Sequence, residues 1–373
     1  MPGLFDPIEI NGLKLGNRLI RSATWEGMCE TDGRPTPKLT KFYHALALGE
    51  VGLIITGYTF VSPEGKQLPG KMGIHTDTFA ADYKSMVDAV HDAGGKICLQ
   101  LVHAGGQTDS GNAGRKPLAP SAIASAQYPE IPAEMTADDI SNVVRAFGDG
   151  ARRAKEYGFD AVQLHGAHGY LINQFLSPLT NRRGDLYGGT AVNRLRFLRE
   201  VYEAVRTAVT PDYPVLIKLN GSDFLAGGLD REEALSVARY LDEAGIDAIE
   251  VSGGTPASGE QTPARKKISS EEQEGYNLSL AADIKKHVTC PVFSVGGFRS
   301  LSVIEKALAD HAADCFSMAR PFIREPDLAK RWRLGETTKA RCISCNGCFI
   351  PGIKEGGIYC VAEKKEREKA QEQ

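Results

Sequence analysis

Long apolar runs are absent from this chain, and none approaches the roughly 18–20 residues that a membrane-spanning helix needs. The N-terminus, residues 1–7, has no basic region followed by an apolar stretch, so we predict no secretory signal. Charge of one sign is also scarce. The net charge is −3 over 373 residues, which gives no electrostatic attraction to nucleic acid or to an anionic membrane. We therefore expect a cytoplasmic protein with no nucleic-acid or membrane partner.

A Gly-x-Gly-x-x-Gly motif is missing after every apolar segment, which weakens the case for a dinucleotide-binding, doubly wound sheet. Present instead is a series of short and almost continuously apolar segments. Such segments are typical of strands that are buried on both faces of a parallel sheet. They comprise residues 18–24, 53–60, 96–103, 161–165, 215–220, 248–252, 292–296 and 315–320.

Amphipathic helical stretches lie between these segments, at 82–93, 137–157, 193–209, 232–244, 300–309 and 327–334. The alternation predicts an α/β fold, a (β/α)8 TIM barrel over residues 1–335, with a doubly wound open sheet as the alternative. The Asn11-Gly12 pair predicts an N-terminal hairpin with a type I′ turn, which could plug one end of the barrel. The longest insertion, about 104–136, follows the third strand and is a candidate lid.

A polar cluster follows the fourth predicted strand. His165 and His168 are three residues apart, and Tyr170 comes two residues later. Polar groups at the end of a buried strand cost stability unless each is satisfied, so the cluster predicts a functional site. The alternative is that both histidines merely cap the strand.

Two further strand ends predict a phosphate site. The loops after strands seven and eight are the usual place for phosphate in such barrels, and Gly296-Gly297 and Arg320 lie there. A Gly-Gly pair lets backbone N–H groups approach a phosphate, and Arg320 offers a bidentate charged fork. The alternative is a tight turn, with Arg320 paired to an acidic residue.

Lys218 and Gln100 are expected to point from their strands toward the centre of the barrel mouth. A buried lysine requires a negative partner, and a cofactor that becomes anionic on reduction would provide one. Gln100 offers both a donor and an acceptor to the edge of a heterocycle, and a structural role for it is equally compatible with the sequence.

The chain resembles the old yellow enzyme family of FMN-dependent oxidoreductases from Phe5 to about Pro326. The similarity is carried by His165-Gly-Ala-His-Gly-Tyr170 and the residues that follow it to Gly189, with support from Asn17-Arg18, Gln100–Gly105 and Ala319–Pro321. The resemblance implies a barrel with non-covalent FMN at its C-terminal mouth. The cofactor-binding residues that we predict are Ser22, Ala23, Thr24, Gly57, Gln100, Lys218, Gly254, Gly296, Gly297, Ala319 and Arg320.

The same resemblance implies an ene-reductase in which hydride passes from NAD(P)H through FMN to an α,β-unsaturated carbonyl compound. His165 and His168 would hold the substrate oxygen, and Tyr170 would donate a proton. Two departures from the family pattern are Trp25, where many members have Thr or Cys beside the flavin, and Lys218, where many have Arg. The alternatives are a flavin dehydrogenase or demethylase on the same scaffold and an electron-transfer flavoprotein subunit. We expect a homo-oligomer.

Eight cysteines are present, and four of them cluster in residues 336–373, which we expect to form a C-terminal arm. Cys342, Cys345, Cys348 and Cys360 have a spacing that signals a metal site. The segment resembles the cluster-binding stretch of 2,4-dienoyl-CoA reductase-type enzymes, which carry a further FAD-binding portion, but it has one residue fewer between its second and third cysteines. We expect no second flavin domain here. Three interpretations are open: a [4Fe–4S] cluster, a zinc or other structural site, and free thiols in an arm that packs on the barrel or on a neighbouring subunit.

Overall fold

A closed parallel barrel forms the centre of the computed structural model, which describes residues 2–372. Each strand pairs with the next along the chain, and the last pairs with the first through Ser317 and Ile20. The predicted (β/α)8 barrel is therefore confirmed, and the open-sheet alternative is wrong. The barrel strands are β3 (Leu19–Arg21), β4 (Leu53–Ile55), β6 (Ile97–Val102), β9 (Ala161–Gly166), β10 (Val215–Asn220), β11 (Ala248–Ser252), β12 (Val292–Val295) and β13 (Cys315–Met318).

The second strand is shorter than predicted. Strand β4 ends at Ile55, and the chain pairs with β6 again only in β5 (Thr59–Phe60). Between them, the amide of Gly57 donates to Glu26 Oε1 at 3.0 Å and to the Tyr43 hydroxyl oxygen at 3.0 Å. These side chains take the amide that a continuous strand would give to its neighbour, so the ladder is interrupted there.

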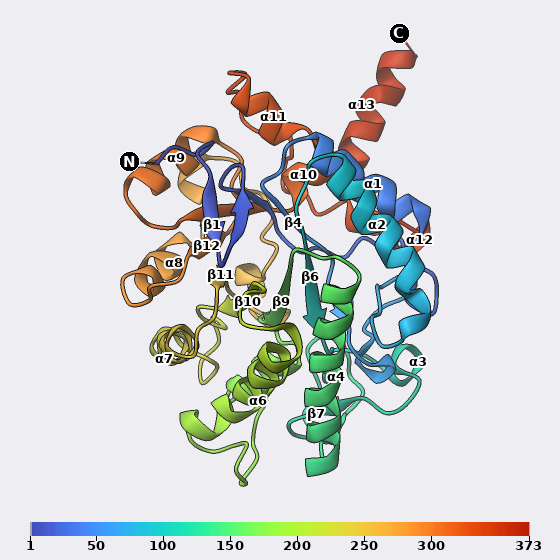
Figure 1. Cartoon of the computed structure of the whole chain (residues 1–373), viewed down its shortest axis with the longest axis vertical. Helices are drawn as coiled ribbons and strands as arrows, with labels where there is room; N and C mark the ends of the chain where they lie inside the picture. Colours follow the sequence, from blue (N-terminus) through green and yellow to red (C-terminus); the bar gives the residue numbers. More distant parts are fainter. Residues whose placement is uncertain (1, 373) are drawn as a thin grey trace.

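Helices surround the barrel (Figure 1). The predicted start of the long helix α4 is confirmed by a capping box between Thr136 and Asp139, and Gly245 after α7 has a φ of +86°, as expected for its position. Four of the helices named below were not predicted, α1, α5, α8 and α10, although Thr36 before Pro37 is a helix-start signal for α1. The helices are α1 (Pro37–Leu48), α2 (Ala80–Asp92), α4 (Ala137–Glu156), α5 (Leu171–Leu176), α6 (Ala191–Val209), α7 (Arg231–Glu243), α8 (Leu278–Lys285), α9 (Leu301–Ala309), α10 (Arg320–Arg324) and α11 (Leu328–Arg333).

The predicted N-terminal hairpin is present as β1 (Ile8–Ile10) and β2 (Leu13–Leu15), which pair antiparallel. Asn11 and Gly12 have φ of +44° and +79°, as a type I′ turn requires. The hairpin closes the N-terminal end of the barrel, because its apolar side chains join one buried cluster with residues of the strand starts. That cluster contains Ile10, Leu13, Leu15, Ile20, Leu53, Ile55, Cys98, Ala161, Leu216, Ala248, Phe293 and Cys315.

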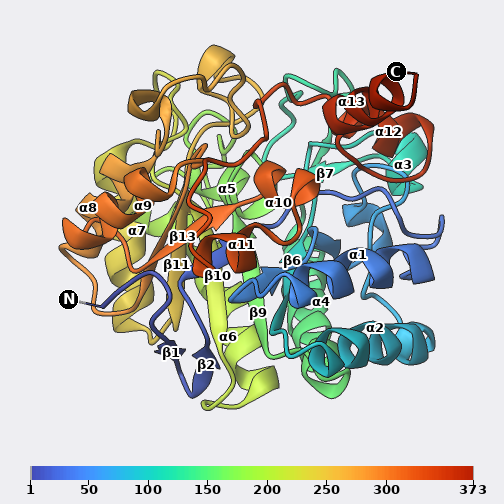
Figure 2. The ribbon, with the colours of Figure 1, turned by 90° about the horizontal axis from the view of Figure 1, so that it is seen from above.

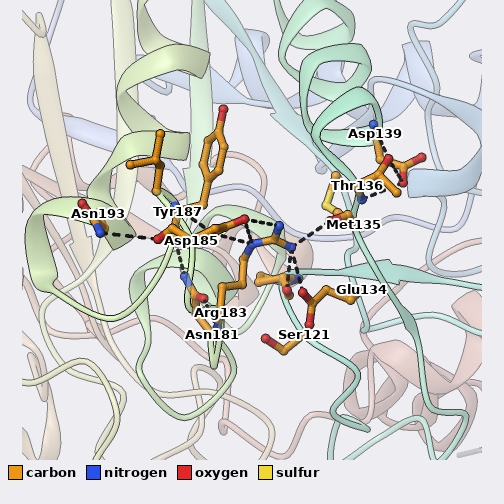
Figure 3. A network of polar contacts seen from close by, with 12 residues as sticks. Ser121, Glu134, Met135, Thr136, Asp139, Asn181, Arg183, Asp185, Tyr187 and Asn193 are labelled. Atoms are coloured by element: carbon orange, nitrogen blue, oxygen red, sulfur yellow. Dashed lines mark hydrogen bonds and ion pairs between the residues drawn. The ribbon is translucent and has the colours of Figure 1, made fainter.

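The insertion after β6 contains α3 (Ser110–Ala113) and the short parallel pair β7 (Leu118–Ala119) and β8 (Ala133–Glu134). Arg183, from the segment after α5, holds it in place (Figure 3). Its guanidinium donates to the carbonyl oxygens of Pro120 at 3.0 Å and Met135 at 2.8 Å, and it pairs with Asp185. The part of the family motif that follows the polar cluster therefore fastens the insertion to the barrel.

The C-terminal residues fold back over the barrel mouth, at the end opposite the hairpin (Figure 2). This arm contains α12 (Phe349–Lys354) and α13 (Val361–Gln371). Gly352 packs so closely on Trp25 that a Cβ at this glycine would lie 2.9 Å from the indole ring, and the amide of Ile358 donates to the Glu26 carbonyl oxygen at 2.9 Å. The arm therefore covers Trp25, which is one of the two residues at which the sequence departs from the family pattern.

Within residues 2–372, no helix has the length and apolar character needed to cross a membrane.

Candidate active site

A cavity of about 500 Å³ opens at the C-terminal mouth of the barrel. Three elements contribute to its wall: the strand ends, the loops that follow them, and the arm through Asn346, Phe349 and Ile353. The structure brings most of the predicted site residues together around this one cavity, although they are spread over almost 300 residues of sequence. Those that line it are Ser22, Ala23, Thr24, His165, His168, Tyr170, Lys218, Gly297, Ala319 and Arg320.

The other four predicted residues do not line this cavity. Gln100 lies buried below it, and the glycines are explained by close backbone packing. A Cβ at Gly57 would lie 2.0 Å from Glu26 Oε2, one at Gly254 would lie 2.1 Å from the Gln261 carbonyl oxygen, and one at Gly296 would lie 2.9 Å from the Asn277 nitrogen. Their proposed contact with a cofactor remains a prediction.

A buried hydrogen-bonded chain crosses the barrel directly beneath the cavity. Gln100 Nε2 donates to Gln163 Oε1 at 2.6 Å, and Gln163 Nε2 donates to Glu250 Oε2 at 2.9 Å. On the other side, Ser22 Oγ donates to Glu250 Oε1 at 2.6 Å. Lys218 Nζ donates to Ser22 Oγ at 2.7 Å and lies 3.3 Å from Glu250 Oε2. These five residues are called the polar layer below.

Glu250 is the residue that sequence reasoning missed. The sequence predicts that Lys218 finds its negative partner in a cofactor, but the protein supplies a carboxylate. Burial lowers the pKa of Lys218, and the charge of Glu250 opposes that effect. An acidic residue in the middle of an apolar strand, Ala248-Ile-Glu-Val-Ser252, was a signal that could have identified it.

His165 is a neutral donor at this site. Its Nδ1 accepts a hydrogen bond from the Ala167 amide at 3.3 Å, so the proton of the neutral ring is on Nε2. Burial lowers the pKa of His165 well below its ordinary value, and electrostatic interaction with His168, Lys218 and Lys71 lowers it further. The ring is therefore uncharged at neutral pH and donates without bringing a charge of its own.

His168 lies beside His165, with ring centroids 5.1 Å apart. Its backbone has a φ of +63°, an uncommon conformation for a side-chain-bearing residue, which the Asn220 side chain supports by accepting from the His168 amide at 3.2 Å. His168 Nε2 lies 2.7 Å from Ser252 Oγ. When Ser252 donates to that nitrogen, the ring proton is on Nδ1. Burial, with the charge of Lys218, also lowers the pKa of His168.

Tyr170 completes the group. Its ring centroid lies 4.7 Å from that of His165, and its hydroxyl donates to Gln67 Oε1 at 2.8 Å. Burial raises the pKa of Tyr170, so the phenol is protonated at neutral pH. The two uncharged rings and the protonated phenol thus lie together at one wall of the cavity, and their roles as hydrogen-bond donors and proton donor stay predictions.

Arg320 also lines the cavity, and it contacts the backbone of Arg265. Arg320 Nη1 donates to the Arg265 carbonyl oxygen at 2.8 Å and to Asn346 Oδ1 at 2.7 Å. The Arg265 guanidinium lies 4.3 Å from the centroid of the Tyr276 ring. Among the ion pairs of residues 2–372, neither arginine has a carboxylate partner. The alternative in which Arg320 pairs with an acidic residue is therefore not met in the described residues, and its cation is available to an anionic ligand in the cavity.

A second, smaller cavity of about 210 Å³ adjoins the first, and Gln107 and Pro256 line both. The insertion forms one side of it through residues 119–126, and the segment of Gly169 and Asn173 forms another. The candidate lid thus borders the site on the side of Tyr170.

All four cysteines of the arm are free thiols in the structure. Cys342 and Cys348 are buried, and Cys345 is exposed. In the part of the chain that the structure describes, no group of three or more His, Cys, Asp or Glu side chains has the arrangement of a metal site. The arm does pack on the barrel, and Cys348 is part of the main apolar core. The metal and cluster interpretations remain predictions.

The closed barrel carries two uncharged histidines, a tyrosine, a buried lysine and Arg320 at its C-terminal mouth, an arrangement suited to binding an anionic cofactor. Comparison with known proteins gives the family. The chain belongs to the NADH:flavin oxidoreductase / NADH oxidase family, whose model matches residues 3–338. This confirms the resemblance to the old yellow enzymes.

Individual relatives agree. The chain is 38% identical to an NADH oxidase of Thermoanaerobacter brockii over 352 residues, which is 93% of this chain and 54% of that protein. Its structure matches a 2-naphthoyl-CoA reductase complex with a TM-score of 0.88 at 28% identity, covering 96% of this chain and 56% of the other. It also matches an old yellow enzyme homologue from Zymomonas mobilis with a TM-score of 0.78 at 29% identity, covering 91% and 94%. The chain spans about half the length of the first two proteins.

The residues at the mouth fit FMN, which this family uses with NAD(P)H as hydride donor. Gln100 Oε1 is a buried acceptor with no partner in the described residues, and the pyrimidine edge of a flavin offers an N–H donor. Lys218 would bring a positive charge to the bound flavin, and Arg320, which has no carboxylate partner among the ion pairs of residues 2–372, would suit its phosphate. A buried acceptor without a donor is costly, so its presence points to a ligand.

Proposed function

We propose that the protein is an ene-reductase, which reduces the activated C=C bond of α,β-unsaturated carbonyl compounds with NAD(P)H. The observation that carries the proposal is the group of His165, His168 and Tyr170, which places two neutral donors and a protonated phenol at one wall of a cavity that fits FMN. That set matches the needs of an enone, whose oxygen gains charge and whose α-carbon gains a proton.

The cofactor would be held by Gln100 Oε1, Lys218, Gly297 and Arg320. When bound, FMN supplies the hydride for the β-carbon of the substrate, having taken it from NAD(P)H. Glu250, the partner of Lys218, also accepts hydrogen bonds from Ser22 and Gln163, so Lys218 is not its sole source of compensation. The positive charge of Lys218 can therefore stabilise negative charge at the mouth in every step.

The two histidines act on the carbonyl oxygen. His165 Nε2–H and His168 Nδ1–H donate to it and stabilise the enolate charge that develops there, in the manner of an oxyanion hole. Because both rings are neutral, the positive charge of the site stays on Lys218 and Arg320. Each donor is expected to contribute about 10²–10³-fold to the rate.

Tyr170 acts on the α-carbon. Its O–H bond breaks and a C–H bond forms at that carbon, which leaves a phenolate on the protein until water returns a proton. Product then carries the hydride on one carbon and the tyrosine proton on the other.

The test is Tyr170→Phe against Tyr58→Phe, because Tyr58 donates to the same Gln67 oxygen and lines the same cavity. We expect Tyr170→Phe to lower the rate of cyclohexenone reduction by about 10²–10⁴-fold and Tyr58→Phe to change it far less. Each protein is purified with its flavin, which absorbs near ~450 nm, and the reduction of the flavin by NAD(P)H is followed separately.

An unchanged enone rate in Tyr170→Phe would remove this tyrosine as the proton donor. Full flavin reduction by NAD(P)H with no turnover of any enone would favour the rival functions, a dehydrogenase or demethylase, or an electron-transfer subunit.

A further inference from the structure

Lys71 is a buried cation that the chemistry above does not use. It lies between β5 and α2, is 1% exposed, and has no carboxylate partner among the ion pairs of residues 2–372. Its one hydrogen bond runs from Nζ to Gln67 Oε1, at 2.7 Å. A lone buried ammonium costs several kcal/mol by burial alone, so its position calls for a function.

Gln67 connects this lysine to the catalytic tyrosine. Its Oε1 accepts from Lys71 Nζ at 2.7 Å, from the Tyr58 hydroxyl at 2.7 Å and from the Tyr170 hydroxyl at 2.8 Å. An ammonium can only donate, so the amide must present its oxygen to Lys71. A carbonyl oxygen has two lone pairs, and Lys71 and Tyr58 can satisfy both. Tyr170 can therefore release its proton without leaving Gln67 unsatisfied.

Two aromatic rings lie close to the Lys71 ammonium. Lys71 Nζ lies 2.8 Å from the ring centroid of Tyr58 and 5.6 Å from that of Tyr170. Contact with aromatic faces favours the charged form of a lysine, and so does the nearby carboxylate of Glu26. Burial acts in the opposite direction and is the larger effect, so the pKa of Lys71 lies well below its ordinary value. A phenolate on Tyr170 would add a negative charge that favours the ammonium form.

We propose that Lys71 is a positioning residue for proton donation: it orients Tyr170 through Gln67 and supplies the positive charge that offsets the phenolate left on Tyr170. The inference rests on the proposed function. When the O–H bond of Tyr170 breaks, a negative charge appears at a fully buried site, where a cation within about 6 Å interacts strongly.

The other titratable groups around Tyr170 do not replace Lys71. The Tyr128 hydroxyl lies 3.5 Å from the Gln67 carbonyl oxygen, and Tyr58 is a neutral phenol. His165, the ring closest to Tyr170 among the aromatic contacts, has its pKa lowered and is neutral. Glu26 is negative and already pairs with Arg21. Lys71 is thus the cation on the side of the cavity where the Tyr170 phenol lies.

The test replaces Tyr170 with a fluorinated tyrosine whose phenol titrates near neutral pH, and follows that phenol by ¹⁹F NMR in the flavin-loaded protein. We expect Lys71→Met to raise the pKa of this phenol by about 1–2 pH units, and Lys71→Arg to restore most of the difference. Lys66→Met is the matched control, because the Lys66 side chain donates to the Thr31 carbonyl oxygen and leaves Gln67 alone. In the protein with ordinary tyrosine, Lys71→Met is expected to slow enone reduction about 10-fold and to leave flavin reduction by NAD(P)H unchanged.

An unshifted phenol in Lys71→Met overturns the inference. Loss of folding in Lys71→Met also overturns it, since a lysine kept only for its charge is destabilising where it stands and its removal is expected to raise the melting temperature. Failure of the proposed function has a different signature: Tyr170→Phe would keep its enone rate while the fluorinated phenol still responds to Lys71→Met.

Discussion

The two ends of the barrel interior are built from the same strands and have opposite character. At the N-terminal end, Ile20, Leu216 and Ala248 belong to an apolar floor closed by the hairpin. Two residues further along each of these strands come Ser22, Lys218 and Glu250, which form the polar layer. Side chains two apart on a strand point to the same face, so one step toward the mouth changes the interior from apolar to charged.

The apolar floor serves mainly the stability of the fold, and the polar layer serves mainly its function, although both lie on the same strands. Burial of the floor stabilises the fold by about 25 cal/mol per Å² of apolar surface. The polar layer costs free energy, since its charges must be taken out of water, and it is tolerated because each member has a partner. Within the polar layer, Gln100 Oε1 is the atom left without a partner in the described residues, and it lies buried below the cavity. Three substitutions test this contrast between the apolar floor and the polar layer.

The largest effect is expected for Lys218→Met in the polar layer. The change leaves Glu250 buried without its cation, so the free energy of unfolding should fall by about 3–5 kcal/mol, and FMN should bind less tightly. Urea titration with and without FMN measures both. The double variant Lys218→Met, Glu250→Gln is the control and should recover most of the stability without the cofactor affinity. A single variant as stable as the parent would contradict the view of the layer as a paired set of charges.

A substitution in the apolar floor is expected to cause a comparable loss of stability without a loss of function. Phe293 is fully buried there, and Phe293→Ala should lower the free energy of unfolding by about 3–5 kcal/mol through the cavity that it leaves. Phe293→Leu, the milder control, should cost less. Turnover per folded molecule and FMN affinity should match the parent in both. A drop in either would show that the two ends of the interior are coupled.

The smallest effect is expected for Gln100→Leu. The variant removes the unpaired acceptor but deprives Gln163 Oε1 of its donor, so the free energy of unfolding should change by no more than about 1 kcal/mol. FMN should dissociate about 5–10-fold more readily, which flavin fluorescence measures on dilution. Cys98→Ala, two residues earlier in the floor, is the control and should keep the FMN affinity of the parent. Equal FMN affinity in Gln100→Leu would mean that this amide is structural.

The local features were predictable from sequence. The eight strand positions, the Asn11-Gly12 turn and the start of the helix predicted at 137–157 depend on side-chain periodicity and on backbone preferences over a few residues. All three are confirmed, although the second strand is shorter than predicted. The group of His165, His168 and Tyr170 was visible for the same reason, because it occupies six consecutive residues at one strand end.

The contacts between distant residues were not predictable. Glu250 meets Ser22 across 228 positions of sequence, and Tyr170 meets Gln67 across 103. Neither Gln67 nor Lys71 stands in a recognisable pattern, and the arm gave no sign that its Gly352 would pack on Trp25.

The sequence by itself determined the barrel, its hairpin plug and the strand end that carries His165, His168 and Tyr170, since each depends on the geometry of a short stretch of backbone. Tertiary structure decided how each buried charge is compensated: Lys218 by Glu250, and Lys71 by the acceptor and rings around Tyr170. The physical reason is that compensation requires atoms within a few ångströms of one another in a medium from which water is removed. Only the closing of the barrel, and the folding of its loops over the mouth, brings those atoms together.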